Sequence, residues 1–174
     1  MAENTANSGK PEDAPEIAVI NANCSKFLIF SILDRLYSFP SHLIGEIVLF
    51  ESVYPLPLMP PYVIGVINRY SVPHALLDIS LLLYGKPCPK LYGQKKILVL
   101  NDTIDRIAFL IDDVQDVTDV PQEEITEIER NADSDDLTDT VCASFNWKGS
   151  NVFIIDIEKV LQRVTADCAH AGAW

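Results

Sequence analysis

Short runs of strand-forming residues, each ended by a turn or a proline, recur along this chain and restrict it to a β-rich fold. The segment Phe27–Ile32 is apolar on both faces, as in a strand buried inside a barrel or sandwich, and a turn at Asp34-Arg35 returns it as a hairpin. The further predicted strands are Leu36–Phe39, Glu46–Phe50, Tyr62–Asn68, Val72–Asp78, Lys96–Leu100, Arg106–Ile111, Asp116–Thr118, Val141–Trp147 and Val152–Asp156. These fall into two similar halves, which predicts a mainly all-β fold of paired small barrels rather than an α/β enzyme with a parallel sheet.

Breaks in this pattern divide the chain into parts. Residues 1–24 are polar, contain prolines and lack periodicity, so we expect a disordered tail. The folded part is expected over 25–164, with one subdomain at about 36–90 and a second at about 91–155, separated by a proline-containing connection over 86–95. Apolar residues then mark one face of a terminal helix that, with the terminal strands, completes the barrels: Ile157, Val160, Leu161 and Val164. Residues 165–174 are expected to fray.

The charge balance excludes several classes of function. The 174 residues carry 13 Lys+Arg against 25 Asp+Glu, for a formal net charge of -12. Nucleic-acid binding requires clustered Lys and Arg, and an anionic membrane surface repels an acidic protein, so neither partner is expected. The apolar runs are far shorter than the ~20 residues that span a bilayer, and the N-terminus lacks the apolar segment of a secretory signal. We therefore expect a cytoplasmic protein whose four cysteines are reduced.

Motifs of catalysis and of metal binding are not found in the sequence. The three histidines, His42, His74 and His170, are far apart and have no HExxH or CxxC neighbour, and no glycine-rich phosphate loop occurs. The acidic run that starts at Asp133 fails the calcium-loop spacing at three positions. Asp112 and Asp113 are adjacent strand residues and point to opposite faces, so they do not converge on one substrate. No enzymatic activity, cofactor or metal is expected.

Several motifs, in this order and spacing, resemble those of the CheW-like domain family of bacterial chemotaxis. In the first half, the F-L-x-F-x-L strand and its following tyrosine are matched by Phe27–Ile32 and Tyr37, and V-x-E-[VI] is matched by Ile44–Ile47. The motif P-x-x-P-x-[YF]-[VI]-x-G-[VI]-x-N is matched by Pro57–Asn68, and the closing D-L by Asp78-Ile79. The second half matches V-D-x-V and L-L-D-L at Ile111–Val114 and Phe153–Ile157. The resemblance covers roughly residues 26–164.

The resemblance implies two linked five-stranded, SH3-like β-barrels with short helices. It also implies a non-catalytic adaptor that couples methyl-accepting chemoreceptor tips to the regulatory domain of the histidine kinase CheA, in arrays at the membrane that it reaches through protein contacts. Self-association in rings stays open. By motif position, the residues of the receptor or kinase interface are Ile44, Glu46, Gly65, Asn68 and Tyr70. Simpler roles also fit: Ile44 as core, Asn68 as a turn former and Gly65 for close backbone approach. Glu46, a lone acid among apolar residues, fits function better.

One motif departs from the family pattern. The family has x-R-G after its asparagine, whereas Tyr70 occupies the arginine position and Ser71 the glycine position here. Arg69 is one residue out of register, which in a strand moves a side chain to the other face, so we do not expect it to replace the family arginine. Two alternatives therefore remain. One is a divergent paralogue with an array-scaffold role and altered kinase coupling. The other is a small-ligand-binding β-barrel or a hydrolase that uses Cys142 or His74.

Overall fold

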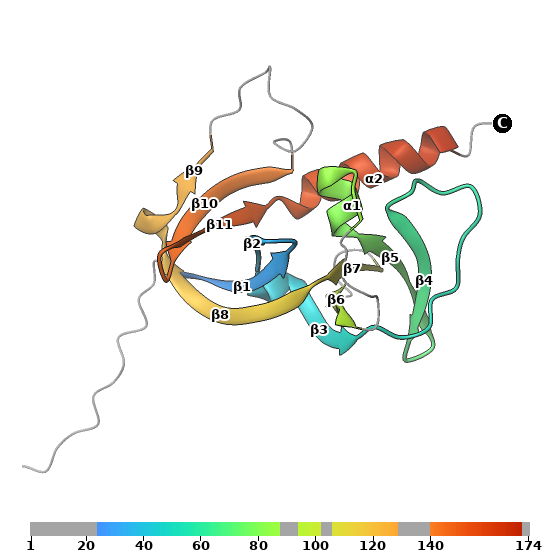
Figure 1. Cartoon of the computed structure of the whole chain (residues 1–174), viewed down its shortest axis with the longest axis horizontal. Helices are drawn as coiled ribbons and strands as arrows, with labels where there is room; N and C mark the ends of the chain where they lie inside the picture. The colour runs from blue at the N-terminus through green and yellow to red at the C-terminus, as the bar shows by residue number, and fades with distance from the viewer. Residues whose placement is uncertain (1–23, 88–93, 102–105, 129–139, 172–174) are drawn as a thin grey trace, which may run out of the picture.

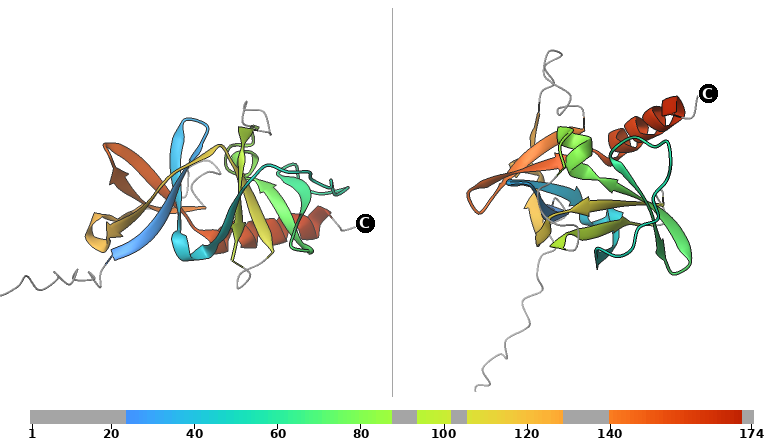
Figure 2. Two further views of the ribbon diagram at one scale, coloured as in Figure 1. Left: turned by 90° about the horizontal axis from the view of Figure 1, so that it is seen from below. Right: turned by 45° about the vertical axis from the view of Figure 1, so that its right-hand side comes forward.

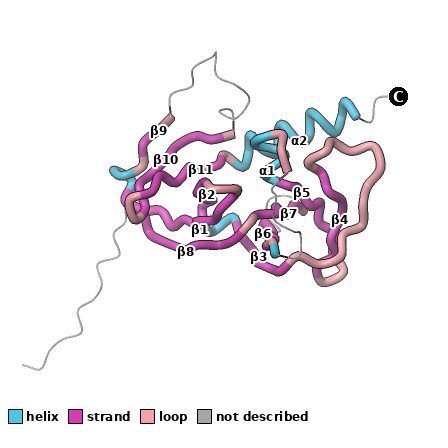
Figure 3. The backbone as a smooth tube through the Cα atoms, in the orientation of Figure 1, coloured by secondary structure: helices cyan, strands magenta, loops and turns pink. Residues whose placement is uncertain are grey.

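The fold is mostly β, with two curved sheets side by side and few helices (Figure 1). In this computed structural model the described residues are 24–87, 94–101, 106–128 and 140–171. The N-terminal residues 1–23 and most of the acidic loop, 129–139, lie outside the described residues, so the expectations for the tail and for the run at Asp133 are not addressed. Strands account for most of the trace, and a long loop joins β3 to β4 (Figure 3).

The six-stranded sheet, called here the terminal sheet, has the order β8-β1-β2-β11-β10-β9. Its strands are β1 Cys24–Ile32, β2 Arg35–Pro40, β8 Asp113–Pro121, β9 Thr126–Glu127, β10 Val141–Trp147 and β11 Ser150–Ile155. Neighbours pair antiparallel except β2 and β11, which are parallel. The two outermost strands, β8 and β9, are joined by the short 3₁₀ helix η3 Gln122–Glu124, so the sheet curls until its edges approach at this corner.

The five-stranded sheet, called here the inserted sheet, has the order β3-β6-β7-β5-β4. It consists of β3 Ile44–Leu49, β4 Val63–Arg69, β5 Val72–Asp78, β6 Lys96–Leu100 and β7 Ile107–Ile111, and the 3₁₀ helix η1 Ser41–Leu43 leads into it. β5 and β7 are parallel and the other neighbours are antiparallel. All its strands come from one continuous stretch of chain, between β2 and β8 of the terminal sheet (Figure 2).

A backbone bridge links the chain just beyond β3 to β4, the strand at the opposite edge of the inserted sheet. Beyond β3, the chain continues to Tyr54, which exchanges two 2.8 Å backbone hydrogen bonds with Val66 of β4. Gly65 permits this approach, because a Cβ built on it would lie 2.3 Å from the Tyr54 carbonyl oxygen. The expectation of close backbone approach at Gly65 is confirmed, and the bridge closes the sheet toward a small barrel.

The largest apolar core is shared by the two sheets. It contains buried side chains of β1 and β2, such as Phe30 and Phe39, and buried side chains of the inserted sheet, such as Leu98 and Phe109. The rings of Phe39 and Phe109 lie 5.4 Å apart across this boundary. Two smaller cores fill the individual sheets. The sheets are therefore packed as one body.

Two helices complete the fold. α1 Ile79–Tyr84 begins at Asp78, whose carboxylate accepts hydrogen bonds from the backbone N–H groups of Ser80 and Leu81. It ends at Gly85, in the left-handed conformation with φ 61°, as the sequence predicts. α2 Ile157–Ala171 follows β11 and runs past α1 toward β4. No helix among the described residues is long and apolar enough to cross a membrane.

Two expectations about organisation are wrong. β6 and β7 belong to the same sheet as β3, β4 and β5, so the division into 36–90 and 91–155 does not hold. The elements on either side of the connection over 86–95 belong to that one sheet, so the connection does not link two barrels; its residues 88–93 lie outside the described residues. The terminal sheet also has a sixth strand, the two-residue β9, beside the expected five. The sequence did not reveal these groupings because parallel pairs such as β2 with β11 join segments that are distant along the chain.

The C-terminal tail expected from residue 165 is helix instead. α2 continues to Ala171, and its last turns have partners elsewhere in the fold. Cys168 packs against the shared core, and Asp167 accepts a 2.8 Å hydrogen bond from the phenol of Tyr62. Contacts with another element hold this end of the helix, which local composition alone does not reveal.

Candidate binding surface on the inserted sheet

Arg69, the last residue of β4, ties together the two edge strands of the inserted sheet. Its Nε donates a 3.1 Å hydrogen bond to Glu46 Oε2 on β3, and Nη2 donates a second to Oε1 of the same carboxylate. Its Nη1 donates a 3.1 Å bond to Glu51, just beyond β3. The Arg69 side chain is 17% exposed. We call these three residues the Arg69 clamp, a forked arginine–carboxylate arrangement of the stronger, charge-assisted kind.

The electrostatics favour a charged clamp. Hydrogen bonding to Glu46, together with the negative charge of both glutamates, raises the pKa of Arg69 above its already high ordinary value, although burial acts in the opposite direction. The guanidinium therefore stays protonated, and the clamp persists across the physiological pH range.

The register of β3 and β4 explains why Arg69 makes the pair. Along β3, Glu46 shares the inner face with Val48, which packs in the core of the inserted sheet. A bulge between Ile44 and Glu46 turns Ile44 to the other face, toward the shared core. Along β4, Arg69 shares the inner face with Ile67, while Asn68 points outward and is exposed. Both charged side chains therefore meet at the open end of the barrel.

The assumption that positions 69 and 70 belong to one strand is wrong, whereas the expectation that Arg69 does not replace the family arginine stays a prediction. Position 70 lies beyond the end of β4, so the alternation of a strand does not extend to it. Glu46 also has a structural partner, which the sequence did not indicate. The sequence motifs did not identify Arg69 and Glu51 as members of the site. The signal that could have identified Arg69 is a long, positively charged side chain on the inward-facing side of a strand, at its end.

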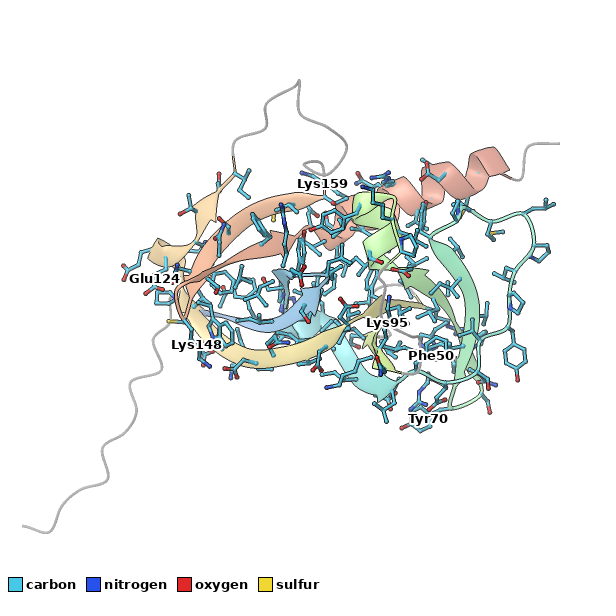
Figure 4. All side chains as sticks on the ribbon, in the orientation of Figure 1. Phe50, Tyr70, Lys95, Glu124, Lys148 and Lys159 are labelled. Atoms are coloured by element: carbon cyan, nitrogen blue, oxygen red, sulfur yellow. The ribbon has the colours of Figure 1, made fainter. Side chains whose placement is uncertain are left out.

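Tyr70 and Ser71 form the turn between β4 and β5. Both have left-handed backbone conformations, with φ values of 49° and 67°, which cost free energy in residues that carry a Cβ. Tyr70 is 85% exposed at the tip of this turn (Figure 4). Its ring lies 5.3 Å from the Arg69 guanidinium carbon, in cation–π range, and its phenol is 3.5 Å from Glu46.

A shallow hollow adjoins the clamp, and exposed apolar side chains flank it. The hollow, of about 330 Å³, is lined by Gly45, Glu46, Arg69, Tyr70, Val72, His74, Val99, Leu100 and Asn101. On the outward face of β3, Ile47 and Leu49 are 43% and 69% exposed. The loop after β3 adds Tyr54, Leu56, Leu58 and Met59. We call Ile47, Leu49 and Tyr70, which lie on β3 or against its Glu46, the apolar face; exposed apolar side chains beside charged ones are typical of protein interfaces.

The five residues predicted from motif position do not all share this site. Glu46 and Tyr70 lie together at the clamp. Ile44 is half-buried and packs against the shared core opposite Leu100, whereas Gly65 serves the Tyr54 bridge. Asn68 is exposed and pairs with Pro73 within the β4–β5 hairpin, so it serves the hairpin and leaves its side chain free of the clamp.

The two residues of the hydrolase alternative lie in different sheets. Cys142, on β10, lines a hollow of about 520 Å³ at the end of the terminal sheet and approaches the Ile154 carbonyl at 3.6 Å. His74, on β5 of the inserted sheet, is buried with Nδ1 3.1 Å from the Val72 carbonyl oxygen. A nucleophile and its base must be within hydrogen-bond reach, so these two do not form a catalytic pair. Among the described residues, no group of three or more potential ligands gathers as a metal site.

Comparison with known proteins decides the family. The model of the CheW-like domain family matches residues 26–165. The chain belongs to the CheW-like domain family. A solved structure of this type, the scaffolding protein TtCheW from Thermoanaerobacter tengcongensis, has a similar fold with a TM-score of 0.67. It is 19% identical in sequence, and the alignment covers 76% of this chain and 89% of that chain. No curated protein sequence matched the chain.

The family assignment confirms the fold class expected from the sequence, with two sheets of five and six strands in the CheW-like arrangement. Within this CheW-like domain, the acidic member of the V-x-E-[VI] motif, Glu46, is held by Arg69 at the position before the family arginine.

Proposed function

We propose that this chain is a chemotaxis adaptor that couples chemoreceptors to the histidine kinase CheA by binding both, without catalysing a reaction. The match of the CheW-like domain over residues 26–165 carries this proposal. TtCheW, which has a similar fold, is described as a scaffolding protein. An adaptor works through surfaces, and the exposed apolar face beside the Arg69 clamp offers one.

The apolar face is the surface that we assign to the kinase. Ile47 and Leu49 present apolar side chains outward from β3, and the Arg69 clamp lies at their border. An apolar centre with a charged rim is the usual anatomy of a protein interface. Tyr70 belongs to this surface because it is exposed and contacts both Glu46 and Arg69. Following the family, we assign the receptor tip to the region between the two sheets.

The divergent-paralogue alternative rests on Tyr70 and Ser71. These residues replace the arginine and the glycine of the family, so a kinase surface matched to the usual arginine meets an aromatic ring here. The Arg69 clamp favours the coupling function, since it keeps a guanidinium paired with Glu46. Self-association in rings and a location in the cytoplasm, at receptor arrays, are parts of the same proposal.

The test uses two glutamate substitutions at exposed apolar positions, one in each sheet. Leu49→Glu places a charge in the apolar face, and Val117→Glu places the same charge on β8 of the terminal sheet, where Val117 is 50% exposed. Both proteins are titrated with a CheA regulatory domain and with a receptor hairpin fragment. We expect Leu49→Glu to weaken kinase binding by about tenfold or more, as charge burial in an interface requires, and Val117→Glu to bind as the unchanged protein does.

The outcomes separate the candidate functions. Binding of receptor but not of kinase by the unchanged protein supports the scaffold paralogue. Binding of neither, with folding intact, contradicts the adaptor function. Equal loss of kinase binding in both variants contradicts the assignment to the apolar face and leaves the adaptor function standing.

A further inference from the structure

Asp112 is the single residue at which the chain crosses from the inserted sheet to the terminal sheet. β7 ends at Ile111 and β8 begins at Asp113. The backbone N–H of Asp112 donates to Ser31 at 3.1 Å, and its carboxylate accepts a 2.6 Å hydrogen bond from the N–H of Leu33 in the β1–β2 turn. Asp112 is 2% exposed. The crossover is thus anchored to the first hairpin of the terminal sheet.

A buried lysine links this crossover to the end of β5, the strand that neighbours β7 in the inserted sheet. Lys95, which is 1% exposed, immediately precedes β6 and lies in the middle of the molecule (Figure 4). Its Nζ is 3.9 Å from Asp112 Oδ1 and 3.7 Å from Asp78 Oδ2. Asp78 is fully buried at the end of β5, where it also caps α1. Lys95 therefore bridges β5 and the crossover.

The neighbouring residues form a second ion pair on the other face. Lys96 Nζ lies 2.5 Å from Asp113 Oδ1, and these two side chains are 34% and 48% exposed. Two successive lysines therefore pair with two successive aspartates at the crossover, one pair buried and one at the surface. This arrangement provides a matched control, because the exposed pair has the same chemistry and nearly the same place.

Stability alone does not explain a buried triad of charges. Removing ions from water is costly, and apolar side chains of similar volume often stabilise a core at least as well. The apolar core shared by the sheets holds them together, but apolar contact has no preferred direction. Ion pairs, in contrast, join particular atoms, so they favour one relative placement of the segments that carry them. We propose that Lys95 fixes the orientation of the two sheets relative to each other by holding Asp112 against Asp78.

This role does not depend on the proposed function. It concerns the angle between two packed sheets, and it holds whether or not the protein binds a kinase. For an adaptor, the consequence is that surfaces on the terminal sheet and on the inserted sheet face their partners at a set angle. Lys95 is then a positioning residue, not a binding residue.

Two substitutions test the bridge from its two ends. Asp112→Asn keeps an oxygen to accept from Leu33 but removes the ion pair of Lys95 with Asp112, while that with Asp78 remains. Asp78→Asn keeps a helix-capping side chain but removes the ion pair of Lys95 with Asp78, while that with Asp112 remains. Each variant leaves Lys95 with a buried carboxylate nearby, so each is expected to fold. Asp113→Asn is the control at the exposed pair.

The measurement is the set of amide residual dipolar couplings of each weakly aligned protein, which report the orientation of each sheet. In the unchanged protein and in Asp113→Asn, one alignment tensor is expected to fit both sheets. In Asp112→Asn and in Asp78→Asn, each sheet is expected to fit a tensor of its own, with axes that differ beyond the fitting error or with reduced magnitude in one sheet.

Three outcomes overturn the proposal. The first is a single shared tensor with the unchanged orientation in both variants, because the bridge would then be dispensable. The second is a change in one variant only, because a bridge requires both ends. The third is loss of the folded spectrum in both variants, because the charges would then serve stability rather than orientation.

Discussion

The phenol of Tyr62, just before β4, donates a 2.8 Å hydrogen bond to Asp167 in the last turns of α2. This contact joins residues 105 positions apart and fixes the end of the terminal helix on the inserted sheet. Burial, and then the hydrogen bond to Asp167, raise the pKa of Tyr62 above its ordinary value of 10.0. An ionised phenol would face the Asp167 carboxylate, so folding opposes loss of its proton.

We predict that Tyr62→Phe weakens the pH dependence of stability above pH 10. The unfolded tyrosine ionises near pH 10 while the folded one stays protonated, so its contribution is complete below pH 10 and is lost as the pH rises further. The limiting slope is about 1.4 kcal/mol per pH unit for one tyrosine. Urea unfolding at pH 7, 9 and 10.5 measures it. Parallel pH profiles for the two proteins would show that Tyr62 contributes nothing.

We predict that Gly65→Ala destabilises the fold much more than Gly149→Ala does. Both glycines have positive φ values, 153° and 82°, but only at Gly65 would the new Cβ collide with backbone, at Tyr54. The collision should disrupt the Tyr54–Val66 bridge and cost about 2–4 kcal/mol, against about 1 kcal/mol at Gly149 for the left-handed backbone alone. Chemical unfolding of both variants provides the comparison. Equal losses would mean that the sheet closes without this bridge.

We predict that Ser71→Gly stabilises the protein by about 0.5–1 kcal/mol. Ser71 has a φ of 67°, which glycine adopts without the penalty that a Cβ brings, although glycine also raises the entropy of the unfolded chain. Ser71→Ala is the control, because it removes the hydroxyl and keeps the Cβ. The urea midpoint should rise for glycine and not for alanine. A rise with both would point to the hydroxyl instead of the backbone.

We predict that Arg69→Met lowers the free energy of unfolding by about 1–2 kcal/mol, since the substitution leaves two glutamates without their common partner. The control is Lys26→Met, which breaks an exposed ion pair with Asp119 at 3.7 Å and should change stability by less than about 0.5 kcal/mol. Raising the salt concentration should reduce the difference between the stability losses of Arg69→Met and Lys26→Met only slightly, because the Arg69 clamp is partly buried. Similar losses in both variants would reduce the clamp to an ordinary surface pair.

We predict that Tyr70→Arg leaves thermal stability nearly unchanged and tightens binding to a CheA regulatory domain from a system with the usual arginine. Tyr70 is 85% exposed, so its replacement disturbs little packing. One charge-assisted bond at the interface contributes about 1.5–3 kcal/mol, or roughly 10- to 150-fold in affinity. Paired titrations against kinase domain and receptor tip measure the change. Equal kinase affinity of the two proteins would place Tyr70 outside the contact.

The parts of the fold that could be predicted are those with local signals. The β4–β5 and β10–β11 hairpins follow from alternation and turn residues, and Gly85 predicts the end of α1. Asp112 and Asp113 do face apart, as their buried and exposed ion pairs show, but the reason is not the expected strand alternation, because Asp112 lies in the bend between β7 and β8. Sheet membership could not be predicted, because β6 and β7 resemble the start of a new domain until β5 is seen to pair with β7.

The candidate site was predictable only in part, for the same reason. The motif identified Glu46 and Tyr70, which lie at one site, but it could not show that β4 ends at Arg69 or that this residue faces inward. The position at which a strand ends depends on how far the adjacent strands continue to pair with it, and the strand's own sequence does not show this. The true length of α2 likewise depends on Tyr62, from another part of the chain.

The position of the inserted sheet within the chain also sets an order of assembly during synthesis. Every strand of that sheet lies between Ile44 and Ile111, so its hydrogen bonding can be complete while the ribosome still holds the remainder. The terminal sheet has to wait, because β2 pairs with β11 and needs the chain as far as Ile155. During that interval the first hairpin, β1–β2, exposes apolar side chains such as Phe30 and Phe39, and the finished inserted sheet is the nearest surface that can shelter them.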